Sequence, residues 1–286
     1  MIAHRRRNRP RYDRVASRSA AVVIAGYSTS FGWATRLLPA DMRGHIRNIY
    51  ALVRVADEIV DEPDAGWPAA DRARLLDDLE AETRRAVQER RSPNLVVHAF
   101  ALTARSYGID ADLIDPFFAS MRTDLTRSGH DAASLTEYVY GSAEVVGLMC
   151  LRVFVDGDAA AYDGLSGGAR RLGAAFQKVN FLRDLGADLD ELGRSYVQVD
   201  PDSFHDTDRD RLLDDIDDDL AAAQAALLAL PVGARVAVRA AHSLFAELSR
   251  RLRATPATDI RRTRVRVPGP RKAWLVGRAL VSRGRR

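Results

Sequence analysis

Two stretches of the sequence repeat one arrangement of side chains on a helix, and this repeat constrains the fold more than any other feature. In the first stretch, Ile46, Tyr50, Val53, Asp57 and Asp61 stand at offsets 0, 4, 7, 11 and 15. At about 100° per residue, these offsets fall within an arc of about 80° on an α-helix. The apolar residues indicate that this stripe faces the interior, although it ends in two carboxylates.

The second stretch has the same spacing and a more polar stripe. Gly173, Gln177, Asn180, Asp184 and Asp188 occupy the same five offsets. Burying so many polar groups without partners would cost several kcal/mol. Two such helices that face each other would therefore form one cavity lined by four aspartates.

Four converging carboxylates repel one another, and divalent cations relieve that repulsion. A site with oxygen ligands and no His or Cys favours Mg²⁺ or Mn²⁺, and bound Mg²⁺ usually completes its shell with water and phosphate oxygens. Arg54 and Arg183 flank the two stripes and supply the positive charge that a diphosphate needs. A single pair of spaced aspartates more often marks a solvated face, as we expect for Asp77-Asp78 and Asp214–Asp219. The repeat with flanking arginines instead indicates a site that binds a diphosphate ester.

The rest of the chain is helical in pattern, with no strand-like alternation and no internal repeat. A first helical region ends at Pro39, and Ser92 and the Ser134/Glu137 pair look like helix N-terminal caps. The helices that follow are expected at about 41–61, 68–91, 93–108, 110–127, 134–155, 159–192 (with a kink near Gly167-Gly168), 209–229 and 232–254, and after Pro270. We predict one all-α domain over residues 15–286 and a mobile basic tail over residues 1–14.

Composition and charge exclude several classes of protein. The lone cysteine, Cys150, cannot form an internal disulfide, so we expect a cytoplasmic protein. No apolar run reaches the roughly 18 residues of a membrane span. The net charge is +4, with basic residues gathered at both ends. We interpret these basic ends as solvated tails rather than as nucleic-acid-binding segments, because no nucleic-acid-binding motif accompanies them.

With these motifs, the sequence resembles the squalene/phytoene synthase family, bacterial phytoene synthases of the actinobacterial type in particular, over about residues 20–280. The two aspartate motifs carry most of the resemblance, the second extended by Arg194-x-Tyr196. Three further segments support it: Tyr27–Phe31 with Leu37–Pro39, Tyr140–Ala143 with Val146-Gly147, and Arg264–Pro268 with Arg271-Lys272.

The resemblance implies an isoprenoid synthase helical fold with a central cavity. It also implies a reaction, the head-to-head condensation of two geranylgeranyl diphosphates through a cyclopropyl (prephytoene) diphosphate to phytoene. This is the first committed step of carotenoid biosynthesis. The implied cofactor is Mg²⁺, with Mn²⁺ as a substitute and no NADPH. The implied metal ligands are Asp57, Asp61, Asn180, Asp184 and Asp188.

The resemblance assigns further roles to residues near the two motifs. Tyr50 and Arg54 join the four aspartates as catalytic residues, although Tyr50 could also be an ordinary core aromatic. The residues expected to bind diphosphate are Ser28, which could instead cap a helix, Arg54, Gln177, Asn180, Arg183, Tyr196 and Arg264. The sequence departs from the family pattern at Glu58, Ala187 and Phe245, which stand where Asp, Glu and Tyr are common.

Two other functions remain open. Squalene or dehydrosqualene synthase would use the same chemistry on farnesyl diphosphate, and Thr35 is a position where chain length could be set. A non-catalytic relative acting as a scaffold would be expected to lose motif aspartates, and all four are present. A terpene cyclase or a chain-elongating synthase would have differently spaced motifs.

The expected partners are prenyl diphosphates, the inner face of the membrane through peripheral contact, and a phytoene desaturase that receives the product.

Overall fold

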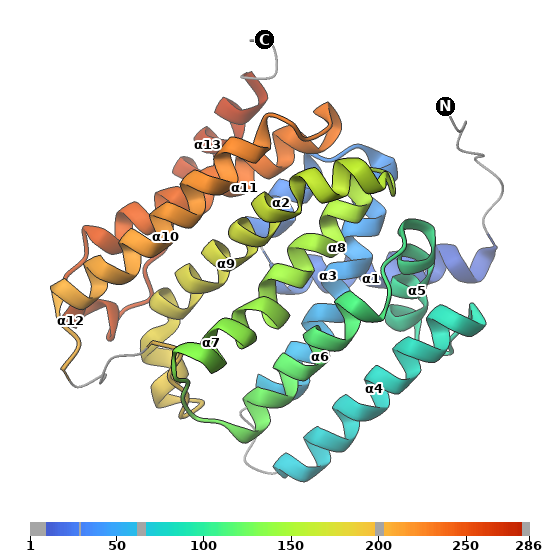
Figure 1. Cartoon of the computed structure of the whole chain (residues 1–286), viewed down its shortest axis with the longest axis horizontal. Helices are drawn as coiled ribbons and strands as arrows, with labels where there is room; N and C mark the ends of the chain where they lie inside the picture. The colour runs from blue at the N-terminus through green and yellow to red at the C-terminus, as the bar shows by residue number, and fades with distance from the viewer. Residues whose placement is uncertain (1–9, 29, 62–66, 198–202, 282–286) are drawn as a thin grey trace.

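The computed structural model describes residues 10–28, 30–61, 67–197 and 203–281, and within these ranges it is built from helices (Figure 1). The all-α prediction is confirmed. The elements are α1 (Arg11–Tyr27), α2 (Ser30–Arg36), α3 (Ala40–Asp61), α4 (Ala69–Glu89), α5 (Leu95–Tyr107), α6 (Ala111–Thr126), α7 (Ala132–Val139), a π-helical turn η1 (Tyr140–Glu144), α8 (Val145–Phe154), α9 (Ala159–Asp190), α10 (Asp206–Leu227), α11 (Val232–Arg253), α12 (Ala257–Ile260) and α13 (Gly269–Val281).

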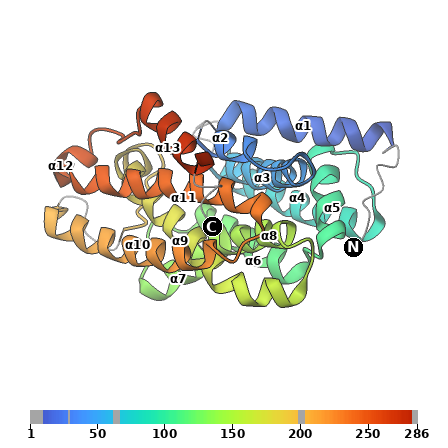
Figure 2. The same ribbon diagram turned by 90° about the horizontal axis from the view of Figure 1, so that it is seen from above.

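The two helices with the repeated stripes, α3 and α9, occupy the interior of the assembly. Helix α3 packs against α1, α4, α5, α6 and α8, whereas α9 packs against α8, η1, α10 and α11. In Figure 1, α10 and α11 lie on one side of α9, and α4 lies at the opposite edge of the molecule. A second view places α1, α2 and α13 together on one face (Figure 2). Helix α8 therefore stands between the two striped helices and contacts both.

Two hydrophobic clusters hold these helices in place. The larger one surrounds α3 and includes Ile49, Leu52 and Phe100. The other lies between α9, α10 and α11 and includes Leu182 and Leu213. At about 25 cal/mol per Å² of buried apolar surface, each fully buried side chain of this size contributes roughly 1.5–3 kcal/mol. Ile46 belongs to the larger cluster and Val53 packs against it, so the apolar part of the first stripe points inward as predicted.

Glycines allow α8 and α9 to approach closely. A Cβ atom on Gly147 would lie 2.7 Å from the Ala169 carbonyl oxygen, and one on Gly173 would lie 2.6 Å from the Ala143 carbonyl oxygen. Both distances are below any normal contact, so only glycine fits at these crossing points. Gly173 begins the polar stripe of α9, and its small size brings that stripe against the turn η1.

Several predicted helix ends differ from the structure. The N-cap of α5 is Asn94, whose side chain accepts hydrogen bonds from two backbone N–H groups, while Ser92 bonds to Glu82 and to Asn94 instead. The N-cap of α7 is Asp131, three residues before Ser134. In both places a nearer acidic or amide side chain reaches the free N–H groups. Helix α9 runs unbroken past Gly167-Gly168, and the short α12 was not predicted.

The N-terminal prediction is wrong in part. Helix α1 begins at Arg11, so residues 11–14 are helical rather than part of a tail. Tyr12 donates a hydrogen bond of 2.7 Å to the Ser92 carbonyl, and Asp13 lies 2.9 Å from a ring nitrogen of His98. These contacts order the segment, and they link positions about 80 residues apart. Residues 1–9 of the predicted tail lie outside the described residues. The extent of the predicted single domain stays a prediction.

None of the helices in the described ranges is both long enough and apolar enough to cross a membrane.

Candidate active site

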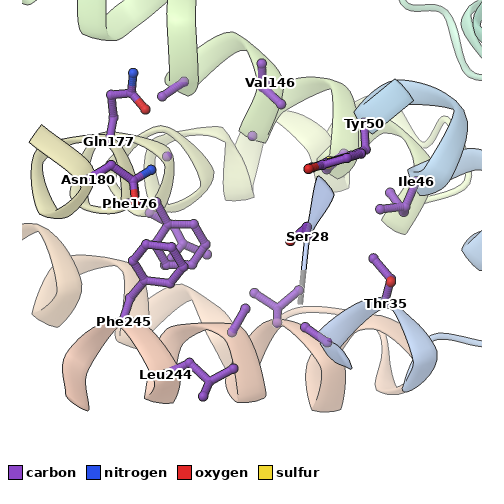
Figure 3. A pocket seen from close by; sticks show the side chains of 18 of the residues that line it. Ser28, Thr35, Ile46, Tyr50, Val146, Phe176, Gln177, Asn180, Leu244 and Phe245 are labelled. Atoms are coloured by element: carbon purple, nitrogen blue, oxygen red, sulfur yellow. The ribbon is translucent and has the colours of Figure 1, made fainter. Parts of the chain in front are cut away.

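A cavity of about 780 Å³ lies between α3, α8, α9 and α11. Its lining comes from segments spread from Gly26 to Lys272, which is most of the described chain. Figure 3 shows Tyr50 and Ser28 on one side of this space, and Gln177 and Asn180 on the other. The stripes of α3 and α9 thus face one cavity, as the sequence predicts.

The cavity has an apolar end. Six side chains from α8, α9, α10, α11 and the α10–α11 turn line it and pack in or against one buried cluster: Leu151, Phe154, Leu165, Leu227, Leu230 and Val238. Leu165 lies 19 residues before Asp184 on the continuous helix α9, which is about 28 Å at 1.5 Å per residue. The cavity as a whole therefore extends along most of α9, from the apolar end to the second aspartate motif.

The other end is polar, and most of the predicted site residues lie there. Eight of them line the cavity: Ser28, Tyr50, Arg54, Asp57, Gln177, Asn180, Arg183 and Arg264. These side chains come from the C-terminal end of α1, the middle of α3, the second half of α9 and the segment before α13. We call this group the polar end. It carries three guanidinium groups beside two side-chain amides, a set of donors that suits a phosphate group.

The first arginine, Arg54, is tied to the first aspartate motif. Its Nη1 lies 2.5 Å from Asp57 Oδ2, and its Nη2 pairs with Glu58. Its guanidinium group also stacks over the Tyr27 ring, 4.7 Å from the ring centre. Glu58 therefore keeps the charge of the aspartate that the family usually has, and it uses that charge to hold Arg54.

Ser28 and Tyr50 form a second contact group at this end. A side-chain hydrogen bond joins them, and burial raises the pKa of the Tyr50 phenol. Ser28 is also the residue that ends α1, where its N–H group bonds to the Ile24 carbonyl. Ser28 thus ends α1 and also lines the cavity, and its role in diphosphate binding stays a prediction.

The second aspartate motif is held by two arginines. Arg183 Nε donates to Asp184 Oδ1 at 2.8 Å, and Arg264 Nε lies 2.7 Å from the same oxygen. Arg264 reaches this carboxylate from a segment 80 residues further along the chain. Asp184 therefore aligns two guanidinium groups at the polar end while lying outside the cavity lining itself.

The expectation that four aspartates line one cavity is wrong in this respect, because only Asp57 is among the lining residues. Asp61 pairs instead with Arg194, whose Nη1 lies 2.6 Å from Asp61 Oδ1. Arg194 also donates to the Val60 carbonyl, and its N–H group bonds to the Asp188 carbonyl, so it joins the ends of α3 and α9. Nearby arginines thus balance carboxylates that would otherwise repel.

The described residues contain no set of three or more His, Cys, Asp or Glu side chains arranged to hold a metal ion. The aspartates nonetheless affect one another. Burial and then Asp61 raise the pKa of Asp57 to about 7. Burial, then Asp184 and Asp61, raise the pKa of Asp188 to about 7. Carboxylates from both helices are therefore close enough to disfavour one another's charge, and an oxygen-only set of this kind fits Mg²⁺ or Mn²⁺.

Two residues of the site were missed by the sequence analysis. Asp124 of α6 is buried and accepts hydrogen bonds from the hydroxyl groups of Tyr138, at 2.8 Å, and Tyr196, at 2.7 Å. Burial raises the pKa of Asp124 to about 6, whereas Arg194, 3.9 Å away, lowers it. The predicted residue Tyr196 therefore lies beside the cavity, in a network that leads through Arg194 to Asp61.

The sequence contains the signal that would have found Asp124. Phe117, Met121 and Asp124 stand at offsets 0, 4 and 7, the same spacing as the first three positions of each stripe. Phe117 and Met121 both line the cavity. Tyr138 lies two residues before the family-like segment that begins at Tyr140, so the resemblance does not point to it.

Two residues on the cavity wall bear on its chemistry. Phe245 stacks on Phe176 with ring centres 3.8 Å apart (Figure 3), so an aromatic contact stands where the family often has a tyrosine hydroxyl. Burial raises the pKa of the Cys150 thiol to about 12, which keeps this cavity residue protonated and weakly nucleophilic.

Comparison with known proteins decides the family. The model of the squalene/phytoene synthase family matches residues 24–271 of this chain. The chain belongs to this family.

Curated members with significant similarity include phytoene synthases of plants and a bacterial relative. Phytoene synthase 2 of Zea mays is 31% identical over 196 residues, which cover 66% of this chain and 45% of that protein. The 4,4'-diapophytoene synthase of Staphylococcus haemolyticus is 28% identical over 180 residues, covering 61% and 59%. The chain thus spans about half the length of the curated relatives that it matches.

Solved structures of the family have the same fold. A dehydrosqualene synthase in complex with a ligand superposes with a TM-score of 0.78 at 19% identity, covering 94% of this chain and 96% of that one. A squalene synthase from Alicyclobacillus acidocaldarius gives a TM-score of 0.73 at 19% identity, covering 85% and 94%. The predicted isoprenoid synthase fold is therefore confirmed.

Proposed function

We propose that this protein condenses two molecules of geranylgeranyl diphosphate head to head into phytoene, through a cyclopropyl (prephytoene) diphosphate. The observation that carries the proposal is the form of the cavity, which is long and apolar at one end and lined at the other by Arg54, Arg183 and Arg264. A volume of about 780 Å³ is near the upper limit of ordinary ligand pockets. Such a space suits two prenyl chains better than one small substrate.

The arginines and amides of the polar end bind the diphosphate groups. Arg183 and Arg264 are held side by side by Asp184, and Arg54 is held by Asp57, so their N–H groups are oriented before a substrate arrives. Donors positioned in advance stabilise charge that develops on a leaving group more than mobile donors can. These residues therefore favour loss of diphosphate from the first substrate.

The carboxylates of both motifs, with the Asn180 amide, are the groups that would hold Mg²⁺, or Mn²⁺ in its place. The bound ions would supply Lewis-acid stabilisation of the departing diphosphate. The full set of ligands that we propose is Asp57, Asp61, Asn180, Asp184 and Asp188.

The apolar end protects the carbocation that forms when diphosphate leaves. The double bond of the second substrate attacks this cation, and proton loss closes the cyclopropane ring. A second ionisation, rearrangement and proton loss then give phytoene. Water would quench each cation, and the leucines and phenylalanines of the cavity exclude it. The protonated Cys150 thiol competes poorly as a nucleophile.

Condensation of two farnesyl diphosphates is the second candidate function. It is favoured by the 28% identity to a 4,4'-diapophytoene synthase, whose name denotes a product of that size class. Squalene formation would also need hydride from NADPH, which we propose this protein does not use. The similarity to plant phytoene synthases at 31–32% identity supports the longer substrate.

The test is incubation of the purified protein with geranylgeranyl or farnesyl diphosphate and Mg²⁺, with and without NADPH, followed by identification of the hydrocarbon. We expect phytoene from the longer substrate, no requirement for NADPH, and loss of activity with a chelator. A C30 product formed in preference would favour the second candidate. The absence of product from either substrate would contradict both, and would favour a scaffold role.

We also propose a cytoplasmic location, with peripheral contact to the inner face of the membrane. The substrates and the product are hydrocarbon-rich, and α13 exposes Trp274 and Leu280 beside Arg271 and Arg278. An exposed surface of aromatic, apolar and basic side chains suits contact with an anionic bilayer. We propose that a phytoene desaturase receives the product at this membrane.

A further inference from the structure

A second, smaller cavity of about 160 Å³ lies between α1, α2 and α3. Its polar lining consists of the guanidinium groups of Arg36 and Arg47, the Trp33 indole and the hydroxyl groups of Ser28 and Thr35. Alanines, Ile24 and Gly32 complete the wall, which contains no carboxylate. The proposed reaction uses none of its basic residues.

The positive charge in this cavity is not balanced by the protein. Neither Arg36 nor Arg47 forms an ion pair with a carboxylate in the described parts of the chain. The Nε atom of Arg47 is buried and has no hydrogen-bond partner there. A buried donor without an acceptor destabilises the folded protein, so binding of a ligand that supplies an acceptor would be favoured.

A third arginine adds to the positive potential. Burial lowers the pKa of Arg47, and the neighbouring charges of Arg43 and Arg36 lower it further. Arg43 is turned away, because its guanidinium group donates twice to the Leu38 carbonyl. Arg47 and Arg36 thus carry their positive charges in a cavity whose lining contains no acid, and the charge of Arg43 acts on Arg47 from nearby, which favours binding of an anion.

The small cavity adjoins the large one. Ser28 and Thr35 line both cavities, and Figure 3 labels them on the wall of the large one. Trp33 is 42% exposed, so the small cavity also borders solvent. A ligand there can come from solvent or from a membrane, and it would lie next to Ser28.

We propose that this cavity is a phosphoryl-binding subsite, in which Arg47 and Arg36 hold the oxygens of a phosphate or diphosphate group beside Trp33. The geometry of a guanidinium fork matches such oxygens. The subsite shares Ser28 with the polar end but uses none of the three arginines there, and it does not depend on which hydrocarbon the protein forms. Two sources supply this chemistry, inorganic diphosphate and the headgroup of an anionic lipid.

Trp33 provides a direct readout. The chain has three tryptophans, so a Trp67→Phe/Trp274→Phe variant leaves Trp33 as the sole reporter. Inorganic diphosphate, added in a chelator and at constant ionic strength, should change its fluorescence in a saturable way. In a parallel arm, phosphatidylglycerol vesicles are compared with phosphatidylcholine vesicles. Saturation by diphosphate or by the anionic vesicles alone identifies the source and supports the subsite.

Matched variants decide whether the response belongs to this cavity. Arg47→Gln should weaken binding about tenfold, and Arg36→Gln at least threefold. Arg85→Gln removes one exposed charge on α4 and should leave the binding measured by Trp33 fluorescence unchanged. Arg264→Gln at the polar end should also leave this binding unchanged. Far-UV circular dichroism checks that each variant is folded. Equal binding by the native protein and both cavity variants would overturn the proposal, as would loss of the response in Arg264→Gln alone.

Discussion

At the scale of single residues, the site is organised by ion pairs rather than by open carboxylates. Each arginine of the polar end is held by an acid from an aspartate motif, and Asp184 holds two of them. An arginine fixed in this way loses less conformational entropy when it binds a phosphate. The aspartates therefore have a second role beside the proposed metal binding, because they orient the donors.

Asp184→Asn tests this double role. We expect at least a 100-fold loss of condensation activity, because the change removes a proposed metal ligand and releases Arg183 and Arg264. The measurement is the rate of hydrocarbon formation at saturating Mg²⁺. Asp78→Asn, an exposed acid on α4, is the control and should keep native activity. Full activity in Asp184→Asn would contradict the assignment of the second motif.

Another acidic residue also holds several arginines, and it lies outside the cavity lining. Glu247 of α11 is buried and pairs with Arg250, Arg251 and Arg271, the last of which belongs to α13. These hydrogen bonds lower the pKa of Glu247 to about 2. Because the folded-state pKa lies below the unfolded value, the charged form stabilises the fold above about pH 4.5, and this contribution is lost as pH falls toward 2.

Glu247→Gln should therefore lower the free energy of unfolding by about 2 kcal/mol at pH 7. The difference from the native protein should shrink as the pH is lowered from about 5 toward 2, because in this range the unfolded chain binds a proton at this glutamate that the folded protein does not bind. Urea unfolding at a series of pH values measures this. Glu137→Gln, on the exposed face of α7, should show little effect at any pH. A difference that does not change with pH would refute the assignment.

At the scale of elements, the close crossing of α8 and α9 sets the position of the second polar stripe. Gly173 lies at this crossing, where a Cβ atom would also meet the Glu144 Cα at 3.1 Å. Backbone atoms cannot move aside as a flexible side chain can. The two helices would therefore have to separate, which would shift the stripe of α9 relative to α3.

Gly173→Ala should thus destabilise the protein by about 1–3 kcal/mol, the usual cost of overpacking. Gly164→Ala is a matched control in the same helix, because a Cβ atom there meets nothing within 4 Å. The control should be neutral, or more stable by up to about 1 kcal/mol through its helix propensity. Thermal unfolding of both variants provides the comparison. Equal stability of the two would show that the crossing tolerates a larger residue.

The helix ends show how far local sequence determines an element. Proline and glycine positions predicted most of the helices within a few residues, because these residues act on the backbone locally. The caps of α5 and α7 were misplaced because Asn94 and Asp131 compete with nearby serines for the same N–H groups. The choice among several capable side chains depends on the path of the preceding loop.

At the scale of the whole molecule, we expect the length of the apolar end to limit the chain length of the proposed substrate. Val238 of α11 lines this end and packs against α8, α9 and α10. Filling this space from the far end leaves the polar end unchanged. Discrimination between chain lengths by such a change is typically about 10- to 200-fold per contact, or roughly 1–3 kcal/mol.

Val238→Phe should therefore lower kcat/KM for geranylgeranyl diphosphate at least tenfold relative to farnesyl diphosphate. The control is Val232→Phe, on the same helix but 56% exposed, which should leave the ratio unchanged. Steady-state kinetics with both substrates measure the ratio. An equal loss with both substrates would indicate that the change disturbs the fold, and it would not support a role in chain length.

The helical architecture and the two stripes follow from the sequence alone, because helix periodicity relates only residues a few positions apart. The sequence also predicted that Arg54, Gln177, Asn180 and Arg183 face a common cavity, since each lies on or beside a stripe. The packing of the helices, in contrast, sets which distant groups meet there. Arg194 reaches Asp61 across 133 positions, and Tyr196 reaches Asp124 across 72. Such pairs depend on helix crossings and loop paths, which no local spacing encodes.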